Sequence, residues 1–372
     1  TRCSRDWSSD VCSSDLNNTI FFNQKFGGIS RYITCLAESL VKKNIDVKIV
    51  APIHKNKYLN KISKELISGF FIKRIPNLKI IDKFNNFLFK KNIFFKNSKI
   101  IHDTYYSESL LYVKNKKKVL TIYDMIHEKF PNLYGKDLTS HRKRIISQSD
   151  FFICISKKTQ EDFLNFYNVS KERTKVIYLG AEHIIKENNI LNFNIGFKKP
   201  FILYVGSREK YKNFITLFNA YCYSNKLKND FNIVCFGGKY FSKDELINFE
   251  KNNLRLNLFH VTGGDDVLKQ LYIKASVLVF PSIYEGFGLP LVESMKIGCP
   301  VIASNAEVIK EICGQGVQYF DYNSFEELKI VLEETLYSQN KLDILKKKGY
   351  QIVENFKWSE CADKTLKVYN SI

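Results

Sequence analysis

Short apolar runs alternate with amphipathic stretches along most of the chain. Residues 151–155, 201–205 and 277–280 are uninterrupted apolar runs of the length that buried parallel strands adopt. Between such runs apolar residues recur at helical spacing, as they do over residues 29–40. Strands that alternate with helices in this way form parallel sheets covered by helices. The pattern therefore predicts an α/β fold with doubly wound parallel sheets.

The length of 372 residues exceeds what one hydrophobic core usually holds, so we expect two domains. Residues 183–199 combine Asn, Lys and Gly with little periodicity, which is typical of a linker. We therefore place an N-terminal domain at residues 17–184, a second domain at residues 185–354 and a final helix at residues 355–372. No apolar run reaches the roughly 18 residues that a membrane-spanning helix needs.

The first sixteen residues differ in composition from the rest. They combine Ser, Asp, Cys, Arg and Trp with a near-repeat, whereas the remaining chain is rich in Lys, Asn, Ile and Phe. They also lack the apolar core of a signal peptide. We expect residues 1–16 to be foreign, dispensable sequence, with a native disordered tail as the alternative. The first strand of the domain would then be truncated to a remnant at residues 17–22.

Cysteine usage points to a reducing compartment. The nine cysteines show no paired spacing, and several, such as Cys154, Cys235 and Cys299, lie in apolar strand-like or helix-end contexts. Such residues are typical of a reduced core and not of disulfides or zinc sites. The expected location is the cytoplasm.

Positive charge is concentrated in the first domain. Residues 17–184 contain 31 Lys and Arg against 14 Asp and Glu, whereas residues 185–372 contain 24 against 21. A nucleic acid or an anionic membrane surface would each explain this excess. A merely solvated, lysine-rich surface is the third explanation, and composition alone does not separate the three.

The segment 274–300 predicts a strand, a glycine loop and a helix. Gly286 and Gly288 allow the loop backbone to approach a ligand closely, and Pro290 suits the first helical turn. We expect Glu285 and Glu293 to face one pocket at the helix N-terminus, with Glu293 in the first turn. That terminus attracts phosphate, and carboxylates accept hydrogen bonds from sugar hydroxyls.

A basic loop follows the apolar run at residues 201–205. The chain continues through Gly206, Arg208 and Lys212 into a helix expected from Asn213. An arginine offers a rigid two-pronged donor to a phosphate, and a lysine offers a mobile point charge. Both precede a helix N-terminus, so the loop is a second candidate phosphate site.

The N-terminal domain carries three further candidates. Gly27 and Gly28 separate a strand from a helix, which is typical of a close-approach loop. Asp124 and His127 follow the strand expected at residues 119–123, where ligands bind in open α/β sheets. For Asp124 and for His127, contact with a ligand and simple capping of the loop are equally good explanations.

Taken together, these segments resemble the retaining glycosyltransferases of the GT-B fold, group 1 (family 4). The pair Glu285 and Glu293, with residues 280–282 before it and 298–304 after it, resembles the family's Glu-x7-Glu element. Residues 206–213 resemble its diphosphate-binding Gly-x-Arg…Lys-Asn element. The resemblance covers nearly everything after residue 17. It implies two facing Rossmann-like domains, with the helix at 355–372 crossing back onto the first.

The resemblance also implies the roles of the site residues. Arg208 and Lys212 would stabilise the leaving diphosphate, Glu285 would hold the sugar hydroxyls, and Glu293 would hold the ribose diol. The other donor-binding candidates are Gly206, Val261, Thr262, Gly286, Phe287, Gly288 and Leu289. The chain contains no Asp-x-Asp motif, so we expect no metal and no other cofactor.

On the acceptor side the resemblance is less specific. It implies that Gly27, Gly28, Tyr123, Asp124 and His127 lie near the donor phosphate and the acceptor. Many family members have His where this chain has Tyr123, so the family's histidine is not carried over.

The implied reaction is transfer of a hexose from a GDP- or UDP-sugar, with GDP-mannose favoured, to a saccharide or lipid-linked acceptor with retention. The setting would be surface polysaccharide or lipopolysaccharide assembly, at the cytoplasmic face of the membrane. A nucleotide-sugar epimerase or hydrolase of the same fold is the main alternative. A basic nucleic-acid-binding protein is the other, but the chain lacks the aromatic motifs of known RNA modules. We expect no nucleic-acid partner.

Overall fold

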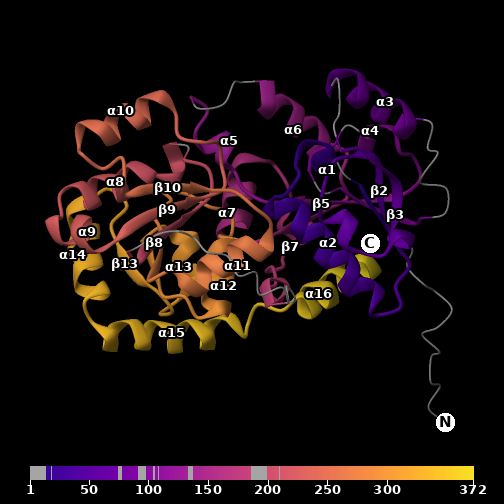
Figure 1. Cartoon of the computed structure of the whole chain (residues 1–372). Coiled ribbons are helices and arrows are strands. Elements are labelled where there is room, and N and C mark those ends of the chain that lie inside the picture. Colours follow the sequence, from indigo (N-terminus) through magenta and orange to yellow (C-terminus); the bar gives the residue numbers. More distant parts are fainter. Residues whose placement is uncertain are drawn as a thin grey trace, which may run out of the picture. The chain divides into compact units, whose positions relative to one another are not determined.

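The computed structural model describes residues 14–17, 19–73, 78–90, 98–103, 105–107, 109–132, 137–185, 199–208 and 210–372 (Figure 1). The chain divides into two compact units, which are described separately. Unit 1 comprises Thr1–Leu179 and Trp358–Ile372, and unit 2 comprises Gly180–Lys357. The expected boundaries, after residues 184 and 354, lie within five residues of these divisions.

Unit 1 is built on a seven-stranded sheet in which all neighbouring strands are parallel, in the order β3-β2-β1-β4-β5-β6-β7. The strands are β1 (Ser14–Asn17), β2 (Val47–His54), β3 (Ile67–Phe71), β4 (Ile100–Asp103), β5 (Lys117–Ile122), β6 (Phe151–Cys154) and β7 (Thr174–Val176). The order reverses direction between β1 and β4, and such a reversal marks the place where α/β sheets bind ligands.

The helices of unit 1 are α1 (Thr19–Asn23), α2 (Gly28–Val41), α3 (Leu78–Lys90), α4 (Ser109–Tyr112), α5 (Ile126–Lys129), α6 (Asp137–Ser147), α7 (Lys157–Phe166) and α16 (Trp358–Ser371). Short 3-10 turns lie at Leu59–Lys61, Lys64–Leu66 and Lys171–Arg173. Ser156, a residue type that favours helix N-caps, caps α7, because its Oγ accepts a hydrogen bond from Thr159 N at 3.0 Å.

The terminal helix α16 packs within unit 1, against α2. The Tyr369 hydroxyl lies 2.7 Å from Nδ1 of His102 in β4, and Nε2 of the same ring lies 2.6 Å from Thr121 Oγ1. Burial lowers the pKa of His102 to about 3, so the ring is neutral and shares its single proton within this network. Two strands and the last helix are thereby joined in one core.

The strand β1 corrects the expectation for the N-terminus. The predicted remnant strand at residues 17–22 is wrong, because Thr19–Asn23 form a helix and the strand is Ser14–Asn17. This strand pairs with both β2 and β4, and Leu16 is fully buried. Residues 14–16 therefore belong to the sheet, while residues 1–13 lie outside the described part. The foreign origin of the segment stays a prediction.

Leu16→Ala tests whether β1 forms as described. Loss of a fully buried leucine side chain is expected to lower the free energy of unfolding by about 2–5 kcal/mol, through lost burial and the cavity left behind. The measurement is the Tm from calorimetry, with Leu256→Ala as control, since Leu256 is 85% exposed. An unchanged Tm for Leu16→Ala would mean that the segment is not part of the sheet.

Unit 2 contains a six-stranded parallel sheet in the order β10-β9-β8-β11-β12-β13. The strands are β8 (Phe201–Val205), β9 (Asn232–Phe236), β10 (Leu258–Val261), β11 (Val277–Phe280), β12 (Val301–Ser304) and β13 (Gln318–Phe320). This is the strand order of the dinucleotide-binding fold, with its reversal between β8 and β11. The doubly wound α/β fold predicted from the hydrophobic pattern is confirmed in both units.

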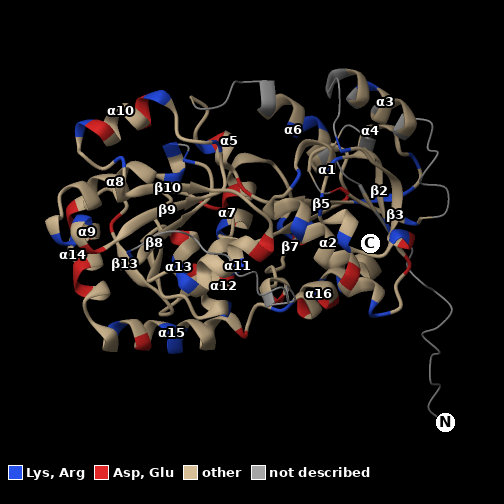
Figure 2. Ribbon diagram, in the orientation of Figure 1, with Lys and Arg blue, Asp and Glu red and all other residues tan. Residues whose placement is uncertain are grey.

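The helices of unit 2 are α8 (Phe214–Cys222), α9 (Asn225–Asp230), α10 (Lys243–Lys251), α11 (Asp265–Lys274), α12 (Leu289–Ile297), α13 (Glu307–Cys313), α14 (Phe325–Leu336) and α15 (Gln339–Val353). Short 3-10 helices lie at Glu182–Ile185 (η4) and Lys210–Lys212 (η5). Acidic and basic residues are interspersed along α10 and α15 (Figure 2).

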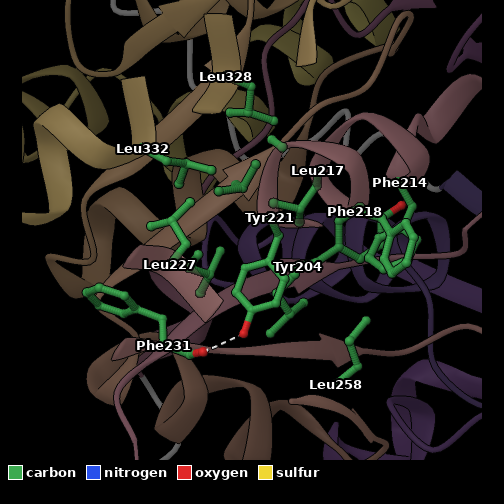
Figure 3. Close-up of a cluster of buried hydrophobic side chains, with 14 of the residues drawn as sticks. Tyr204, Phe214, Leu217, Phe218, Tyr221, Leu227, Phe231, Leu258, Leu328 and Leu332 are labelled. Atoms are coloured by element: carbon green, nitrogen blue, oxygen red, sulfur yellow. Dashed lines mark hydrogen bonds between the residues drawn. The ribbon is translucent and has the colours of Figure 1, made fainter. Parts of the chain in front are cut away.

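One buried core of unit 2 packs β8, β9 and α8 against α14 (Figure 3). Its side chains are mostly aliphatic and aromatic, and the polar end of Tyr221 is satisfied because its hydroxyl donates to the Phe231 carbonyl at 2.6 Å. Burial of this kind makes the strands rigid, so the loops that leave β8 and β11 start from fixed positions.

Two further features bear on the class of protein. Among the described residues, no helix combines the length and the hydropathy that crossing a bilayer requires. The seven cysteines in the described part, Cys35, Cys154, Cys222, Cys235, Cys299, Cys313 and Cys361, are all free thiols. This agrees with their expected role as reduced core residues.

Candidate functional site

The site in unit 2 is built from the loops that follow β8 and β11. These two strands flank the reversal of strand order, so their loops leave the same edge of the sheet side by side. The loops are also tied together, because Ile283 N donates to the Tyr211 carbonyl at 2.8 Å. The basic loop and the glycine loop, predicted separately from the sequence, thus form one site.

Lys212 and Glu285 form the ion pair at its centre. Nζ of Lys212, in η5, lies 2.6 Å from Oε1 of Glu285, and the two side chains are 18% and 10% exposed. The ammonium group also lies 5.7 Å from the centre of the Phe280 ring at the end of β11. A partly buried pair of this kind depends on both partners, since removal of one leaves the other charge uncompensated.

Arg208 has a different set of partners. Its Nε donates to Oε1 of Glu245 in α10 at 2.6 Å, and its Nη2 donates to the Lys239 carbonyl at 2.7 Å. The guanidinium lies over the Phe241 ring at 4.7 Å, while Nη1 is buried with no hydrogen-bond partner among the described residues. A buried donor without a partner is costly, so Nη1 is the atom best placed to gain from an incoming anion.

Glu245 serves two functions at once. Its Oε2 accepts from the Ser242 backbone N at 2.7 Å, in a capping box at the start of α10, while Oε1 accepts from Arg208. Burial acts to raise the pKa of this carboxyl, but the hydrogen bonds from Arg208 and Ser242 outweigh it and hold the pKa below its usual range. Glu245 therefore stays ionised and fixes the direction of the arginine.

Glu293 lies on α12 and is almost fully buried. It is the fifth residue of the helix, so the expectation that it belongs to the first turn is wrong. Oε1 lies 2.9 Å from Nε2 of His183 in η4, and Oε2 accepts from the Tyr272 hydroxyl of α11 at 3.0 Å. These two contacts, one to each oxygen, fix the plane of the carboxylate.

The glycine loop has the backbone geometry that its sequence predicted. Gly288 adopts φ 89° at the N-cap of α12, where a Cβ would approach Leu291 Cδ1 to 2.7 Å. Gly206, at the exit of β8, adopts φ 135° with open space where a Cβ would be. Phe287 is buried, and its ring lies edge-on to Phe356 at 5.6 Å. Gly286 lies in the loop between Glu285 and α12, and Leu289 is the first residue of that helix.

Val261 and Thr262 lie at the end of β10, next to the exit of β9. The Val261 carbonyl accepts from Gly237 N at 3.0 Å, so this oxygen is already used within the sheet. Thr262 is exposed. Their predicted contact with the nucleotide base stays a prediction.

In unit 1, Gly27 and Gly28 lie where α2 begins. Gly27 is the N-cap, and a Cβ there would lie 1.9 Å from Gln24 Oε1, the end of a flexible side chain. Tyr123, directly after β5, is buried with its ring edge-on to that of Tyr32 at 5.8 Å. The body of Tyr123 is thus part of the packing, and its hydroxyl oxygen is buried without a hydrogen-bond partner among the described residues.

Asp124 and His127 have structural partners. Oδ1 of Asp124 accepts from Ile126 N at 3.0 Å, which is the loop-capping role considered as its alternative. Arg142 Nη2 lies 2.8 Å from His127 Nδ1, and because an arginine only donates, Nδ1 accepts and Nε2 carries the proton. Their predicted contact with the acceptor is not tested by these bonds.

The sequence predicts a basic surface cluster at residues 142–144 that nearby acids do not balance, and for Arg142 this prediction is wrong. This arginine is buried and donates from Nη1 to both carboxylate oxygens of Glu128, at 2.9 and 3.2 Å, although we expected no acid nearby. The Tyr167 hydroxyl donates to the same carboxylate at 2.6 Å. Arg142 thus belongs to a buried network and adds nothing to a basic surface.

Sequence reasoning missed Glu245, His183 and Tyr272. The capping-box pattern Ser-x-x-Glu at residues 242–245 could have identified Glu245 as a residue that faces backward from a helix start. No local pattern marks His183, which is 110 positions from its partner Glu293. Among the described residues, no group of three or more His, Cys, Asp or Glu side chains is placed to hold a metal ion.

Two family models together match most of the chain. The model described as "Glycosyl transferases group 1" matches residues 186–352, and the one described as "Glycosyltransferase Family 4" matches residues 26–183. The first contains every candidate of the unit 2 site, and the second contains every candidate of unit 1.

Curated relatives are similar at low identity. The chain is 22% identical over 267 residues to an O-antigen chain mannosyltransferase B of Escherichia coli, covering 68% of this chain and 70% of the relative. It is 29% identical over 213 residues to an N-acetylgalactosaminyltransferase of Campylobacter jejuni whose name includes a diphospho-undecaprenol-linked sugar as its acceptor. This alignment covers 55% of this chain and 56% of the relative. The second alignment thus spans little more than half of that relative.

Solved structures share the fold over nearly their full length. A sucrose-phosphate synthase of Thermosynechococcus elongatus superposes with a TM-score of 0.75 at 20% identity, covering 96% of this chain and 98% of that one. HepE of Anabaena, solved in complex with UDP-glucose, gives a TM-score of 0.74 at 14% identity, covering 97% and 100%.

Proposed function

Because this chain belongs to the group 1, family 4 glycosyltransferases, we propose that it transfers a hexose from a nucleotide-sugar to a saccharide or lipid-linked acceptor with retention. The observation that carries the donor half of the proposal is the Lys212–Glu285 pair at the strand-order reversal of unit 2. A lysine that can bind phosphate and a carboxylate that can accept hydrogen bonds from hydroxyl groups therefore lie together at this edge of the sheet.

The proposed donor geometry follows from these partners. The diphosphate would take over from Glu285 as the partner of Lys212, and Nη1 of Arg208 would gain the acceptor that it lacks. Glu285 would then be free to accept from the sugar hydroxyls, while Glu293, already oriented by His183 and Tyr272, would accept from the ribose diol. As the glycosidic bond breaks, both cations would stabilise the charge that develops on the diphosphate.

The identity of the sugar and acceptor is inferred from relatives. A mannosyltransferase of O-antigen chains supports GDP-mannose as the favoured donor, and a transferase named for a diphospho-undecaprenol acceptor supports a lipid-linked one. HepE was solved with UDP-glucose, which keeps a UDP-sugar as the second choice. The setting would be surface polysaccharide or lipopolysaccharide assembly on the cytoplasmic side.

A thermal-shift panel of nucleoside diphosphates and nucleotide-sugars, followed by product analysis, tests this function. A true donor at 100 times its Kd raises stability by about 2.7 kcal/mol, so one base should stand out. Transfer that needs an acceptor supports the glycosyltransferase, whereas turnover of the donor without acceptor supports an epimerase or hydrolase. No shift with any nucleotide would contradict the proposal.

The proposal includes docking of unit 1 on an anionic membrane. Ile80, Phe84 and Phe87 recur at helical spacing on α3 and are 47–62% exposed. The opposite side of α3 is anchored, because the buried Asn85 side chain exchanges two hydrogen bonds with the Ile53 backbone. Phe70 and Phe71 of β3 are also exposed.

The three exposed apolar residues of α3, with the exposed Lys83 on the same helix, form what we term the α3 patch. Exposed aromatic residues beside basic ones are typical of surfaces that rest on an anionic bilayer. The sequence predicts an apolar stripe of Phe84, Phe87, Leu88, Phe94 and Phe95 beside a basic pair at residues 90–91. Leu88 is half-buried, Lys90 ends α3, and residues 91, 94 and 95 lie outside the described part.

Phe84→Ser with Phe87→Ser is expected to lower the fraction of protein that co-sediments with liposomes, because the apolar contact with the bilayer is lost. Binding of the parent protein should rise with the anionic lipid fraction and fall with salt. Ile247→Ser with Ile273→Ser, two exposed residues of unit 2, is the matched control. Equal sedimentation of both double variants would contradict docking through the α3 patch.

A further inference from the structure

A large open groove lies at the amino-terminal edge of the unit 1 sheet. Its volume is about 1180 Å³. The basic residues that line it are Lys99, Lys114, Lys116, Lys117, Lys118 and Arg173. The remaining lining includes Asp150, several Ser, Asn and Gln side chains, and two aliphatic residues. Neither the donor site nor the α3 patch accounts for it.

The position of the groove separates it from the acceptor candidates of the same unit. Its lining comes from residues that directly precede β4, β5, β6 and β7, or that begin β5. Tyr123, Asp124 and His127 instead follow the end of β5. Because all strands of this sheet are parallel, starts and ends lie at opposite edges. A ligand in the groove would therefore not occupy the candidate acceptor loops.

Part of this positive charge has an internal structural role. Arg173 donates from Nε to the Asp150 carbonyl at 3.0 Å and from Nη2 to the Ser149 carbonyl, just beyond the C-terminus of α6. Lys116 Nζ donates to Ser98 Oγ at 3.0 Å. Cations at a helix C-terminus compensate its exposed carbonyls, so Arg173 is explained without a ligand, and the Lys116 ammonium group is held by the Ser98 hydroxyl.

Lys114, Lys117 and Lys118 have no such role. Within the described part of the chain, the ammonium groups of Lys114 and Lys117 have neither an ion-pair nor a hydrogen-bond partner. Burial lowers the pKa of Lys118, and the Asp150 charge only partly offsets this. Oδ2 of Asp150 already accepts from the Lys118 backbone N at 2.8 Å. All three lysines line the groove, and Asp150 is the one acid among its described lining residues, so basic residues outnumber acids there.

The other lining residues restrict the class of anion. Among the described residues that line the groove, none is aromatic, so it offers no stacking surface for nucleotide bases. A hollow also fits a flat bilayer poorly, and its two aliphatic residues give little apolar contact. Lysines bind phosphate as point charges, and a high density of cations favours a ligand with several charges along its length.

We propose that this groove binds a flexible, non-aromatic polyanion with several phosphate groups, such as an oligophosphate or a phosphate-bearing glycan chain. This site is independent of the proposed transfer reaction. It would hold such a chain at the amino-terminal edge of the unit 1 sheet, apart from the proposed chemistry of unit 2. A phosphorylated glycan and a free polyphosphate share the recognised chemistry, and the experiment separates them.

The test is calorimetric titration of the full chain with long-chain inorganic polyphosphate at low and high salt. The variant Lys114→Gln, Lys117→Gln, Lys118→Gln should lose about tenfold or more in affinity and show a shallower salt dependence, because fewer counterions are displaced. The control Lys42→Gln, Lys64→Gln, Lys367→Gln removes three exposed lysines of unit 1 and should bind within about twofold of the parent. Both triple variants should keep the parent Tm and basal transfer.

Further arms identify the ligand class. Polyglutamate of equal charge, single-stranded DNA and anionic vesicles should each bind more weakly than polyphosphate and should respond less to the groove variant. A phosphate-bearing glycan that competes with polyphosphate would make the glycan the physiological source, and one that does not compete would leave free polyphosphate. Equal loss in both triple variants, or a groove-dependent preference for polyglutamate, DNA or vesicles, would overturn the proposal.

Discussion

Substitution of Lys212 by alanine is expected to lower kcat about 100- to 1000-fold, the usual effect of removing one charge stabiliser from a transition state. The lysine would neutralise the leaving diphosphate, and water cannot replace a fixed charge at the same place. Arg208→Ala is expected to have an effect of the same size. The measurement is steady-state transfer with the donor identified by the nucleotide panel.

The fold offers a close control for Lys212. Lys210 is an exposed lysine in the same 3-10 turn, and Lys210→Ala should retain near-parent activity. Loss of Lys212 also leaves Glu285 without its partner, so part of any loss could come from lower stability. The Tm of each variant separates the two effects. Near-parent transfer by both Lys212→Ala and Arg208→Ala would rule out the diphosphate assignment.

Glu293→Gln is expected to raise the donor KM more than it lowers kcat, whereas Glu285→Gln should mainly lower kcat. A ribose contact is made equally in the ground and transition states, but contacts to the migrating sugar change as the bond breaks. We expect changes of about tenfold or more in the affected constant, the scale of losing one hydrogen bond to a charged group. Full kinetic curves for both variants provide the measurement.

The environment of Glu293 adds a second readout. A glutamine there would present an amide NH2 group to Tyr272 or His183, and Tyr272 donates its hydroxyl to this side chain. Tyr272→Phe removes that donor without changing the carboxylate, so it should raise the donor KM by a smaller factor than Glu293→Gln. Glu250→Gln, an exposed residue of α10, is the neutral control. Identical kinetics of the Glu285 and Glu293 variants would contradict separate roles.

The strands and loops of unit 2 could be predicted because their signals are local. The apolar run at 277–280 coincides with β11, and the glycines and proline that follow determine where α12 begins. Gly288 adopts a positive φ in a turn where a side chain would collide with Leu291, so the turn requires glycine. The hydrophobic period and the turn residues suffice for features of this kind.

The partners of the charged residues could not be predicted, because they come from distant positions. Arg208 is fixed by Glu245, 37 positions later, and Arg142 is neutralised by Glu128 from another helix. Because only charges close in the sequence were compared, Arg142 was assigned to a basic surface, although it is buried. The strand β1 could not be predicted because its residues are mostly polar, which is unusual for a central strand. Its central position is determined by pairing with β2 and β4.

Unit 1 is discontinuous in sequence, since α16 joins it only after all of unit 2 has been made. During synthesis from the N-terminus, unit 2 can complete its core while unit 1 still lacks Trp358 and Tyr369. Until then, Tyr32 lacks the indole against its ring, and His102 lacks one hydrogen-bond partner in a buried position. A nascent chain stalled before residue 358 would thus hold a finished unit 2 and an unfinished unit 1, which makes formation of the last fourteen-residue helix the closing step of folding.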